Sequence, residues 1–178
     1  RFFGLASFVI TCFGPSLIWG ESFRLATYNL EHYVNEGSSI TKKSETSKEK
    51  VCEIVLAIRP DVLAVQEIGG ARPLMQLQEA LRSGGLELPH TELVEGFDKA
   101  IQVAVLSRFP MVRRHSHTNE SFLLRGRRFH SSRGFAEVTI RANSGYEFTL
   151  FTAHLKSKRA SADADEAELR FEESKLLR

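Results

Sequence analysis

Residues 60–68 read PDVLAVQEI, and this short stretch constrains the fold more than any other part of the chain. A nearly continuous apolar run behind a Pro-Asp turn signal predicts a strand that is buried on both faces. The run ends in Gln66 and Glu67, so a carboxylate stands at the end of a buried strand. Because burying an unpaired charge costs several kcal/mol, we expect Glu67 to face a cleft or a cation rather than the core.

The segments around this strand predict further helices and strands. Apolar residues recur at i, i+3, i+4 and i+7 in 51–58 and at helical spacing in 74–81, which predicts two amphipathic helices. Alternation in FRLATYNL predicts a first strand at 23–30. Later strands are expected at 91–95, 101–107, 111–117, 134–141 and 147–153, with a last helix in 160–178. This order predicts an α/β (α+β) domain, a sandwich of sheets with helices outside.

The composition excludes several classes of protein. The 178 residues are 42% hydrophobic and 26% charged, which is the balance of a globular chain of about one domain. Lys and Arg total 24 against 22 for Asp and Glu, so the net charge of +2 does not indicate a purely electrostatic nucleic-acid binder. The only cysteines, Cys12 and Cys52, exclude a disulfide scaffold and a cysteine-rich zinc module. Apolar neighbours predict that Cys52 is buried and unreactive.

The first twenty residues predict a signal peptide. Residues 2–19 carry no charged side chain and are followed by small residues, so 1–20 is expected to be removed and 21–178 to form the mature domain. A retained membrane anchor is the alternative, although Gly14 and Pro15 interrupt the apolar run. Cleavage would place the domain in the periplasm or outside the cell.

Polar side chains stand at the ends of three predicted strands. Asn29 ends the first strand, Glu67 ends the second, and His154 follows the apolar run 148–153. Oxygen ligands from an amide and a carboxylate suit Mg²⁺ or Mn²⁺. A histidine can donate a hydrogen bond to a phosphoryl oxygen, and neighbouring cations such as Lys156 favour an anionic substrate. The set predicts metal-assisted phosphodiester hydrolysis; alternatively, these residues only cap strands at the surface.

An arginine-rich segment points to phosphate as a ligand. Residues 107–133 carry seven arginines against a single carboxylate, Glu120, with phenylalanines between them. Guanidinium groups bind phosphate and stack on bases, so the segment predicts contact with a nucleic-acid backbone. The alternative is a solvated loop whose charge is balanced by the acidic stretch at 163–173. The same segment also holds three histidines, His115, His117 and His130.

Four motifs together resemble one superfamily. ATYNLEHY at 26–33, PDVLAVQEI at 60–68, AVLSRFP at 104–110 and FTLFTAHLKSK at 148–158 resemble the endonuclease/exonuclease/phosphatase superfamily, which has the deoxyribonuclease I-like fold. The resemblance extends over nearly all of 23–178, and HLKSK is most similar to the secreted bacterial nuclease-like branch. It implies a four-layer sandwich of two β-sheets flanked by helices.

The resemblance also implies roles for individual residues. Glu67 corresponds to the principal carboxylate for Mg²⁺ or Mn²⁺, with Asn29 orienting the catalytic water or phosphate close to the metal. Glu31 stands where some members carry a further acidic residue near the metal. His154 matches the histidine that contacts the scissile phosphate and stabilises the leaving oxygen. Arg133, in SRGFAEVTI, matches a phosphate-contacting arginine of several nucleases, and Lys156 is expected to bind substrate.

Two family motifs do not occur in these residues. In the superfamily, a Gly-Asp-Phe-Asn type motif and a Ser-Asp-His type motif follow the histidine that His154 matches, and the second supplies the Asp–His pair that activates water. We therefore expect residues 21–178 to form roughly the N-terminal two-thirds of the domain, incomplete at the C-terminus. We also expect the chain by itself to show little or no phosphodiesterase activity with Mg²⁺.

The expected function is that of an exported, monomeric, metal-dependent nuclease that hydrolyses phosphodiester bonds in nucleic acid. One alternative keeps the fold and changes the substrate, as in a sphingomyelinase- or inositol-phosphate-type phosphoesterase. Another is a non-catalytic binding protein. Aromatic and apolar loops around the cleft would favour a lipid substrate, whereas the arginine-rich segment 107–133 favours nucleic acid.

Overall fold

The computed structural model describes residues 22–35, 38, 40–143, 146–157 and 165–178. The predicted signal peptide, residues 1–20, and part of the predicted last helix lie outside these ranges. Among the described residues, every helix is too short or too polar to cross a membrane.

The first sheet is built around the strand that the sequence predicts to be buried. β2 (Val62–Ile68) pairs in parallel with β1 (Leu25–Tyr33) and antiparallel with β4 (Gln102–Ser107), which in turn pairs with β3 (His90–Val94). All residues of β2 are buried except Glu67. Because β1 and β2 are parallel, both end at the same edge of the sheet, which brings the predicted polar strand ends together.

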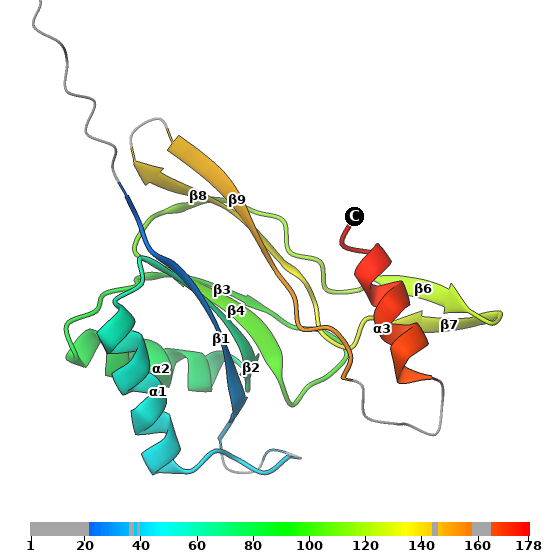
Figure 1. Cartoon of the computed structure of the whole chain (residues 1–178), viewed down its shortest axis with the longest axis horizontal. Coiled ribbons are helices and arrows are strands. Elements are labelled where there is room, and N and C mark those ends of the chain that lie inside the picture. Colours follow the sequence, from blue (N-terminus) through cyan, green and yellow to red (C-terminus); the bar gives the residue numbers. More distant parts are fainter. Residues whose placement is uncertain (1–21, 36–37, 39, 144–145, 158–164) are drawn as a thin grey trace, which may run out of the picture.

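Two helices cover one face of this sheet (Figure 1). α1 (Glu45–Ile58) and α2 (Ala71–Ser83) bury their apolar stripes against β1 and β2, and the residues between the layers form one of two core clusters. Val55 lies at the centre of the α1 stripe and is 1% exposed. Ile54 and Ile58, predicted on the same stripe, remain nearly half exposed because they lie toward its solvent side.

The second sheet packs on the other face of the first. It contains β5 (Met111–Arg114), β8 (Ala136–Asn143) and β9 (Tyr146–Thr152) in the order β5-β8-β9, all antiparallel. Apolar residues of β4 such as Val105 meet inward-facing residues of β8 such as Val138, and these form the second core cluster. Helices, sheet and sheet therefore follow one another in layers, which confirms the predicted fold class.

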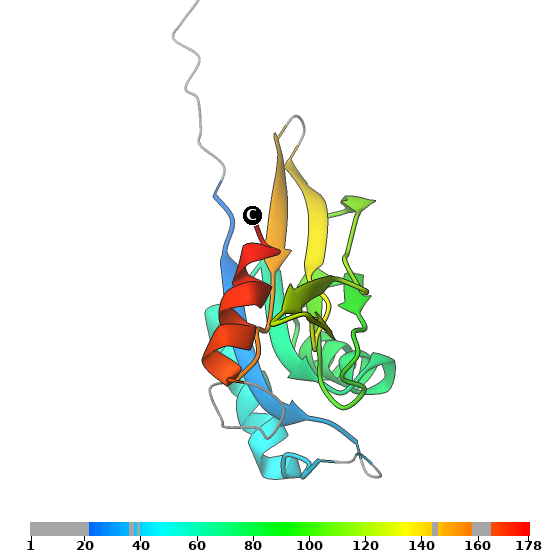
Figure 2. The same cartoon turned by 90° about the vertical axis from the view of Figure 1, so that its right-hand side faces the viewer.

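A hairpin and a helix extend from one end of the second sheet (Figures 1 and 2). β6 (Ser121–Leu124) and β7 (Arg127–His130) pair around Arg125 and Gly126, whose positive φ angles of 50° and 77° suit a tight two-residue hairpin turn. The sequence analysis did not predict this hairpin. α3 (Glu166–Lys175) lies beside it, and Glu168 Oε1 forms an ion pair with Arg125 Nη2 at 2.6 Å.

Candidate active site at the strand ends

Glu67 owes its position to an irregularity at the end of β2. Its φ is +62°, a left-handed conformation that is costly for a residue with a side chain, and the pairing of β2 with β1 and β4 shifts register on either side of it. The irregularity turns the carboxylate out of the core and toward the end of β1, so that its side chain is 14% exposed. Backbone strain of this kind is concentrated at functional sites.

Three N–H groups from β1 organise the carboxylate and its neighbours. Asn29 Nδ2 donates to Glu67 Oε1 at 3.0 Å, and the backbone N–H of His32 donates to Glu67 Oε2 at 3.0 Å. The Glu31 N–H donates to Asn29 Oδ1 at 2.9 Å, which fixes the orientation of the Asn29 amide. Glu31 and His32 adopt positive φ angles of 49° and 59°, so the chain at the end of β1 curls around the carboxylate.

His154 reaches the same carboxylate from the second sheet. Its Nε2 lies 3.6 Å from Glu67 Oε1, which is too long for a hydrogen bond. Gln66 fixes this approach, because its side-chain N–H group donates to Thr152 Oγ1 at 3.1 Å and so ties the end of β2 to the end of β9. Asn29 and His154 line one open groove between the two sheets, with a volume of about 460 Å³.

The carboxyl of Glu67 is held in its ionised form. Burial on its own would raise its pKa, but the hydrogen bonds from Asn29 and from the His32 backbone, together with the nearby His154 and His32 imidazoles, lower the pKa below its usual value. The His32 imidazole contributes from a distance of 3.5 Å between its Nε2 and Glu67 Oε2. Glu67 therefore carries a negative charge across the neutral range.

His154 is held in its neutral form. Burial lowers the pKa of its imidazole, and the positive charges of Arg133 and Arg170 lower it further, against the opposing influence of Glu67 and Asp98. Its Nδ1 is buried and finds no partner among the described residues. A neutral imidazole has one N–H donor and one acceptor nitrogen, so His154 can act as either in the groove that it lines.

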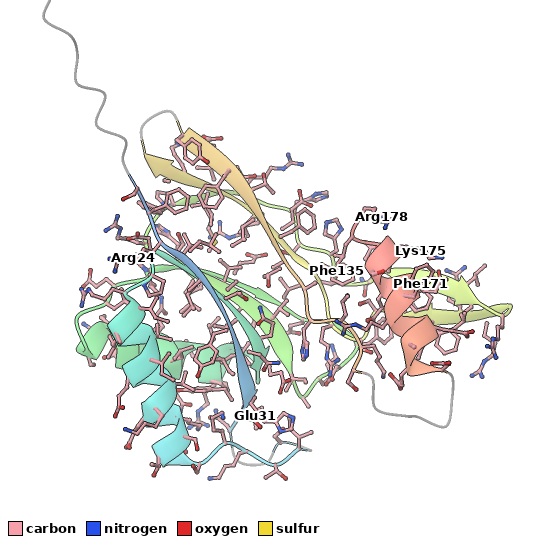
Figure 3. All side chains as sticks on the ribbon, in the orientation of Figure 1. Arg24, Glu31, Phe135, Phe171, Lys175 and Arg178 are labelled. Carbon is pink, nitrogen blue, oxygen red and sulfur yellow. The ribbon has the colours of Figure 1, made fainter. Side chains whose placement is uncertain are left out.

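Glu67, Asn29 and His154 thus meet at one point, whereas the other predicted site residues lie further out. The Glu31 carboxylate is 84% exposed at the end of β1 and pairs with Lys43 at 3.4 Å (Figure 3). The structure therefore places only the backbone of Glu31, and not its side chain, in the hydrogen-bond network around Glu67.

Arg133 and Lys156 flank His154 and are held by carboxylates. Arg133 is 12% exposed and pairs with Asp98 at 3.1 Å, close enough to influence the His154 imidazole. The backbone N–H of Lys156 donates to the buried Glu173 of α3 at 2.6 Å, and its side chain borders a second groove. Both residues lie near the site, but neither touches Glu67 in the described structure.

The sequence analysis missed three residues of this site. His32 was part of the quoted motif ATYNLEHY, and its place three residues after Asn29 was the available signal for it. Gln66 precedes Glu67 in a buried strand, where an amide requires a partner. Asp98 carried no local signal, because its partner Arg133 lies 35 positions away and only the folded chain brings them together.

The second groove lies beside the β6–β7 hairpin and is basic and aromatic. Phe97 and His130 stack with ring centroids 4.1 Å apart, and Phe97 is 53% exposed. Arg127 and Arg128 line the groove and have no carboxylate partner within the described part of the chain. Other arginines of the segment are neutralised by carboxylates, in the pairs Arg108–Asp61, Arg114–Glu92, Arg125–Glu168 and Arg133–Asp98.

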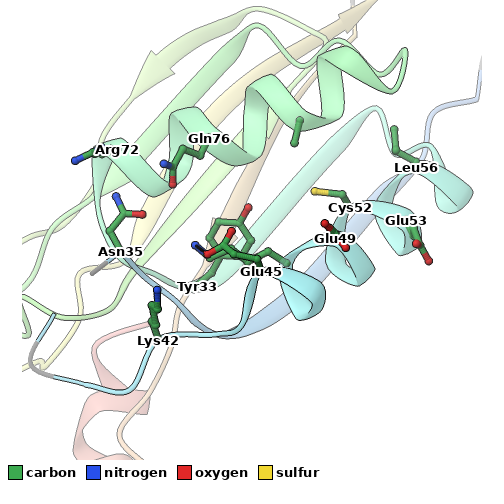
Figure 4. Close-up of a pocket in the computed structure, with 12 residues that line it drawn as sticks. Tyr33, Asn35, Lys42, Glu45, Glu49, Cys52, Glu53, Leu56, Arg72 and Gln76 are labelled. Carbon is green, nitrogen blue, oxygen red and sulfur yellow. Dashed lines mark hydrogen bonds and ion pairs between the residues drawn. The ribbon is translucent and has the colours of Figure 1, made fainter. Parts of the chain in front are cut away.

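Another cavity lies away from these residues, between α1 and α2 (Figure 4). It has a volume of about 770 Å³ and is lined by Tyr33 and Cys52 among others, but not by Asn29, Glu67 or His154. Cys52 is partly exposed here, which corrects the expectation that it is buried. Burial and the neighbouring Glu49 still raise the pKa of its thiol, and a protonated thiol is a poor nucleophile.

The residues at the strand ends fit a hard divalent cation. Each Glu67 oxygen accepts one hydrogen bond from Asn29 or the His32 backbone, which leaves further lone pairs on the ionised carboxylate. Magnesium sites commonly use one or two carboxylates, with water and phosphate completing the coordination. Glu67 is the residue that could hold such an ion, and the amide of Asn29 keeps its carboxylate in place.

Comparisons with known proteins support the fold. No curated protein matches the chain. Solved structures share its fold: an endonuclease/exonuclease/phosphatase from Beutenbergia cavernae DSM 12333 (17% identity, TM-score 0.55), an endonuclease/exonuclease/phosphatase family protein from Leptotrichia buccalis C-1013-b (15%, 0.56) and SmcL (18%, 0.55). These cover 84%, 88% and 87% of the chain, which spans 42%, 61% and 57% of their own lengths.

The family model described as Endonuclease/Exonuclease/phosphatase family matches residues 26–170, a range that includes Asn29, Glu67 and His154. The match begins within β1 and ends within α3, so it covers both sheets and the groove between them. The chain therefore belongs to the endonuclease/exonuclease/phosphatase family, whose members are hydrolases.

Proposed function

We propose that the strand-end site serves metal-dependent hydrolysis of phosphodiester bonds and that its substrate is nucleic acid. The observation that carries the proposal is the convergence of Glu67, Asn29 and His154, which come from three strands and two sheets. An ionised carboxylate and a neutral imidazole lie 3.6 Å apart at the edge of an open groove. This pairing can bind a cation on one side and a phosphoryl oxygen on the other.

The chain's own residues divide the work of binding. Glu67 would hold Mg²⁺ or Mn²⁺ through its unused lone pairs, and Asn29 with the His32 backbone keeps the carboxylate oriented. A divalent ion, when bound there, would supply the Lewis acid that polarises a phosphoryl oxygen. The neutral imidazole of His154 carries one N–H, which can donate a hydrogen bond to a phosphoryl oxygen.

Positive charge behind His154 favours an anionic substrate. Arg133 and Arg170 lie close enough to lower the pKa of His154, so the same charges attract a phosphodiester into the groove. Arg133 is restrained by Asp98 and therefore acts as a fixed charge rather than a mobile clamp. Fixed charges cost little reorganisation when the substrate binds.

The basic and aromatic groove supports nucleic acid as the substrate. Arg127 and Arg128 are exposed and available for phosphates, and the stacked pair of Phe97 and His130 offers an exposed ring face for a base. Stacking on an aromatic side chain contributes about 1–3 kcal/mol per base. A cationic choline headgroup could also contact the ring, but the positive charges of Arg127 and Arg128 in the same groove would oppose it. Lys156 borders this groove only two residues after His154, which connects it to the strand-end site.

Export of the protein is part of the proposal. The uncharged stretch 2–19 supports a signal peptide removed after residue 20, and N-terminal sequencing of secreted material tests it. A mature protein that retains Phe2 to Trp19 in the membrane would contradict this proposal.

The metal site is tested by titrating the chain with Mn²⁺ and following free Mn²⁺ by electron paramagnetic resonance. Glu67→Gln should lose this binding, because it replaces the anionic oxygen with a neutral amide of the same size. Glu79→Gln, on the exposed surface of α2, is the matched control and should bind as the unchanged chain does. Equal Mn²⁺ binding by all three proteins would refute the assignment.

The substrate is tested by binding in the presence of Mg²⁺. Single-stranded DNA should bind with an affinity that falls when Arg127 and Arg128 are both replaced by Gln, whereas sphingomyelin vesicles should bind weakly and independently of these residues. Tighter binding to the vesicles than to DNA would favour the phospholipid alternative.

A further inference from the structure

We propose that His115, His117 and Glu137 form a second metal site that takes Zn²⁺ and is separate from the strand-end site. The three residues lie on the second sheet, around the end of β5 and on β8. Within the described residues they are the one group of three whose ligand atoms all lie within 4.8 Å of one another. None of them contacts Asn29, Glu67 or His154.

The backbone register places the three side chains on the same side of the sheet. The N–H of His115 donates to the Glu137 carbonyl at 2.9 Å, and His117 exchanges two 2.9 Å hydrogen bonds with Phe135. In β8, Ala136 and Val138 face the core and are fully buried, so Glu137 between them points to the outer face. The two histidines are two positions apart and therefore project to that face as well.

The distances between the ligand atoms are slightly shorter than those in a zinc site. Glu137 Oε2 lies 3.1 Å from His115 Nδ1 and 2.8 Å from His117 Nε2. Bonds of about 2.0–2.2 Å to Zn²⁺ with tetrahedral angles separate neighbouring ligand atoms by about 3.3–3.6 Å. An ion can therefore enter by moving each histidine nitrogen away from Glu137 Oε2 by less than about 1 Å, while the two histidine nitrogens already lie within 4.8 Å of each other.

The second nitrogen of His117 already has the partner that metal-bound histidines use. Its Nδ1 lies 3.3 Å from Glu120 Oε1, so a carboxylate, an imidazole and the proposed ion position follow in line. Such a carboxylate fixes the tautomer and strengthens the ligand nitrogen. The ring of Phe151 stacks against His117 at 5.9 Å between centroids and restricts the imidazole further.

The ligand set and its surroundings favour zinc over magnesium. Two imidazole nitrogens and one carboxylate oxygen are the three-ligand set of open zinc sites, and imidazole suits Zn²⁺ better than Mg²⁺. The nearby Arg114 does not oppose a cation, because Glu92 neutralises it at 3.0 Å. Three protein ligands leave a fourth position for water or an exogenous ligand.

The site is tested on the 178-residue chain with Zn²⁺ alone, in competition with a chromophoric chelator. We expect one zinc ion per chain, and a loss of affinity well beyond tenfold for both His117→Ala and Glu137→Gln. Glu120→Gln should weaken binding by about 10–100-fold, the usual cost of losing a carboxylate behind a metal-bound histidine. His90→Ala, a histidine on β3 outside the cluster, should retain the original affinity.

Cobalt and thermal unfolding keep the test independent of folding defects. Co²⁺ bound to the unchanged chain should give the intense visible absorption of a four-coordinate site. Zn²⁺ should raise the Tm of the unchanged chain. Both effects should vanish in Glu137→Gln, although its side chain keeps the same size. Glu67→Gln should keep both effects, so this test is separate from that of the strand-end site. Unchanged zinc affinity in His117→Ala and Glu137→Gln, or no zinc binding at all, would leave only a hydrogen-bonded cluster and overturn the proposal.

Discussion

Glu67 and Glu137 each lie beside two imidazoles, yet their surroundings differ. Around Glu67, the ring nitrogens of His32 and His154 stay 3.5 and 3.6 Å away, and the direct hydrogen bonds come from an amide and a backbone N–H. Around Glu137, two ring nitrogens contact one carboxylate oxygen at 3.1 and 2.8 Å. Each oxygen of Glu67 therefore accepts a single hydrogen bond, whereas one oxygen of Glu137 contacts two ring nitrogens at once.

The difference comes from the backbone rather than from residue type. Glu67 sits at an irregular strand end with a positive φ, where the curled chain brings N–H groups to it. Glu137 occupies a regular position within β8, where strand register places side chains directly opposite it. The same pair of residue types therefore gives two different surroundings, which is the basis for proposing Mg²⁺ at the first and Zn²⁺ at the second.

The largest effect should come from removing the charge of Glu67. In a fusion of the chain to the C-terminal part of a family member, Glu67→Gln should abolish Mg²⁺-dependent plasmid cleavage, a greater loss than the roughly 10²–10⁴-fold typical of removing a general acid or base. Glu79→Gln should cleave normally, and EDTA should stop every active form. Cleavage by Glu67→Gln at more than a hundredth of the unchanged rate would contradict the assignment.

A smaller but still large effect is expected at His154. In the same fusion protein, His154→Gln should lower the rate of cleavage by about 10²–10⁴-fold, because the imidazole is lost while the Glu67 carboxylate stays. Its Mn²⁺ affinity should remain that of the unchanged chain, since His154 lies 3.6 Å from Glu67 and donates no hydrogen bond to it. Parallel loss of Mn²⁺ binding and cleavage would show that His154 acts through the metal site instead.

Much of the fold was predictable because its signals are local. The apolar run 60–68 and the helical spacing in 51–58 and 74–81 identify the central strand and both helices, and the structure confirms all three. The β6–β7 hairpin was missed because its turn, Arg125-Gly126, lacks the Asn-Gly or Asp-Gly signal and its strands are rich in arginine.

The candidate site was less predictable because it depends on contacts between distant residues. Strand ends indicated Asn29, Glu67 and His154, and parallel pairing of β1 with β2 explains why the first two meet. No local pattern revealed that Asp98 holds Arg133, or that the Glu31 side chain turns away to Lys43 while its backbone stays in the network. The direction of the Glu31 side chain depends on the positive φ angles at Glu31 and His32, and the sequence does not reveal such angles at residues other than glycine.

The charges around His154 should move its pKa in opposite directions. Arg133→Gln should raise the pKa, because it removes a repulsive positive charge and frees Asp98, whereas Glu67→Gln should lower it by removing an attractive negative charge. Titration of the His154 ring signals by nuclear magnetic resonance measures both shifts. No shift in either variant would mean that burial alone sets this pKa.

The smallest expected effect is on the pH dependence of stability. Glu67 has a lower pKa in the folded protein than its ordinary value of 4.5, so its stabilisation is present above that pH and is lost as the pH falls through the folded pKa. The two imidazoles also lower the pKa of Glu137, which gives a second contribution of the same sign. Urea unfolding between neutral pH and about pH 3 should therefore show a flatter acid decline in Glu67→Gln and in Glu137→Gln than in the unchanged chain.

The double variant shows whether the two carboxylates are independent. They share no hydrogen-bond partner, so the flattening in Glu67→Gln/Glu137→Gln should equal the sum of the two single effects. A double variant whose effect differs from that sum would mean that protonation of one carboxylate affects the other through the second sheet. The connection would run along β9, where Phe151 contacts His117 and Thr152 accepts a hydrogen bond from Gln66, the neighbour of Glu67. In that case the two sites would form one coupled unit, and their different cation preferences could not be assigned to each carboxylate separately.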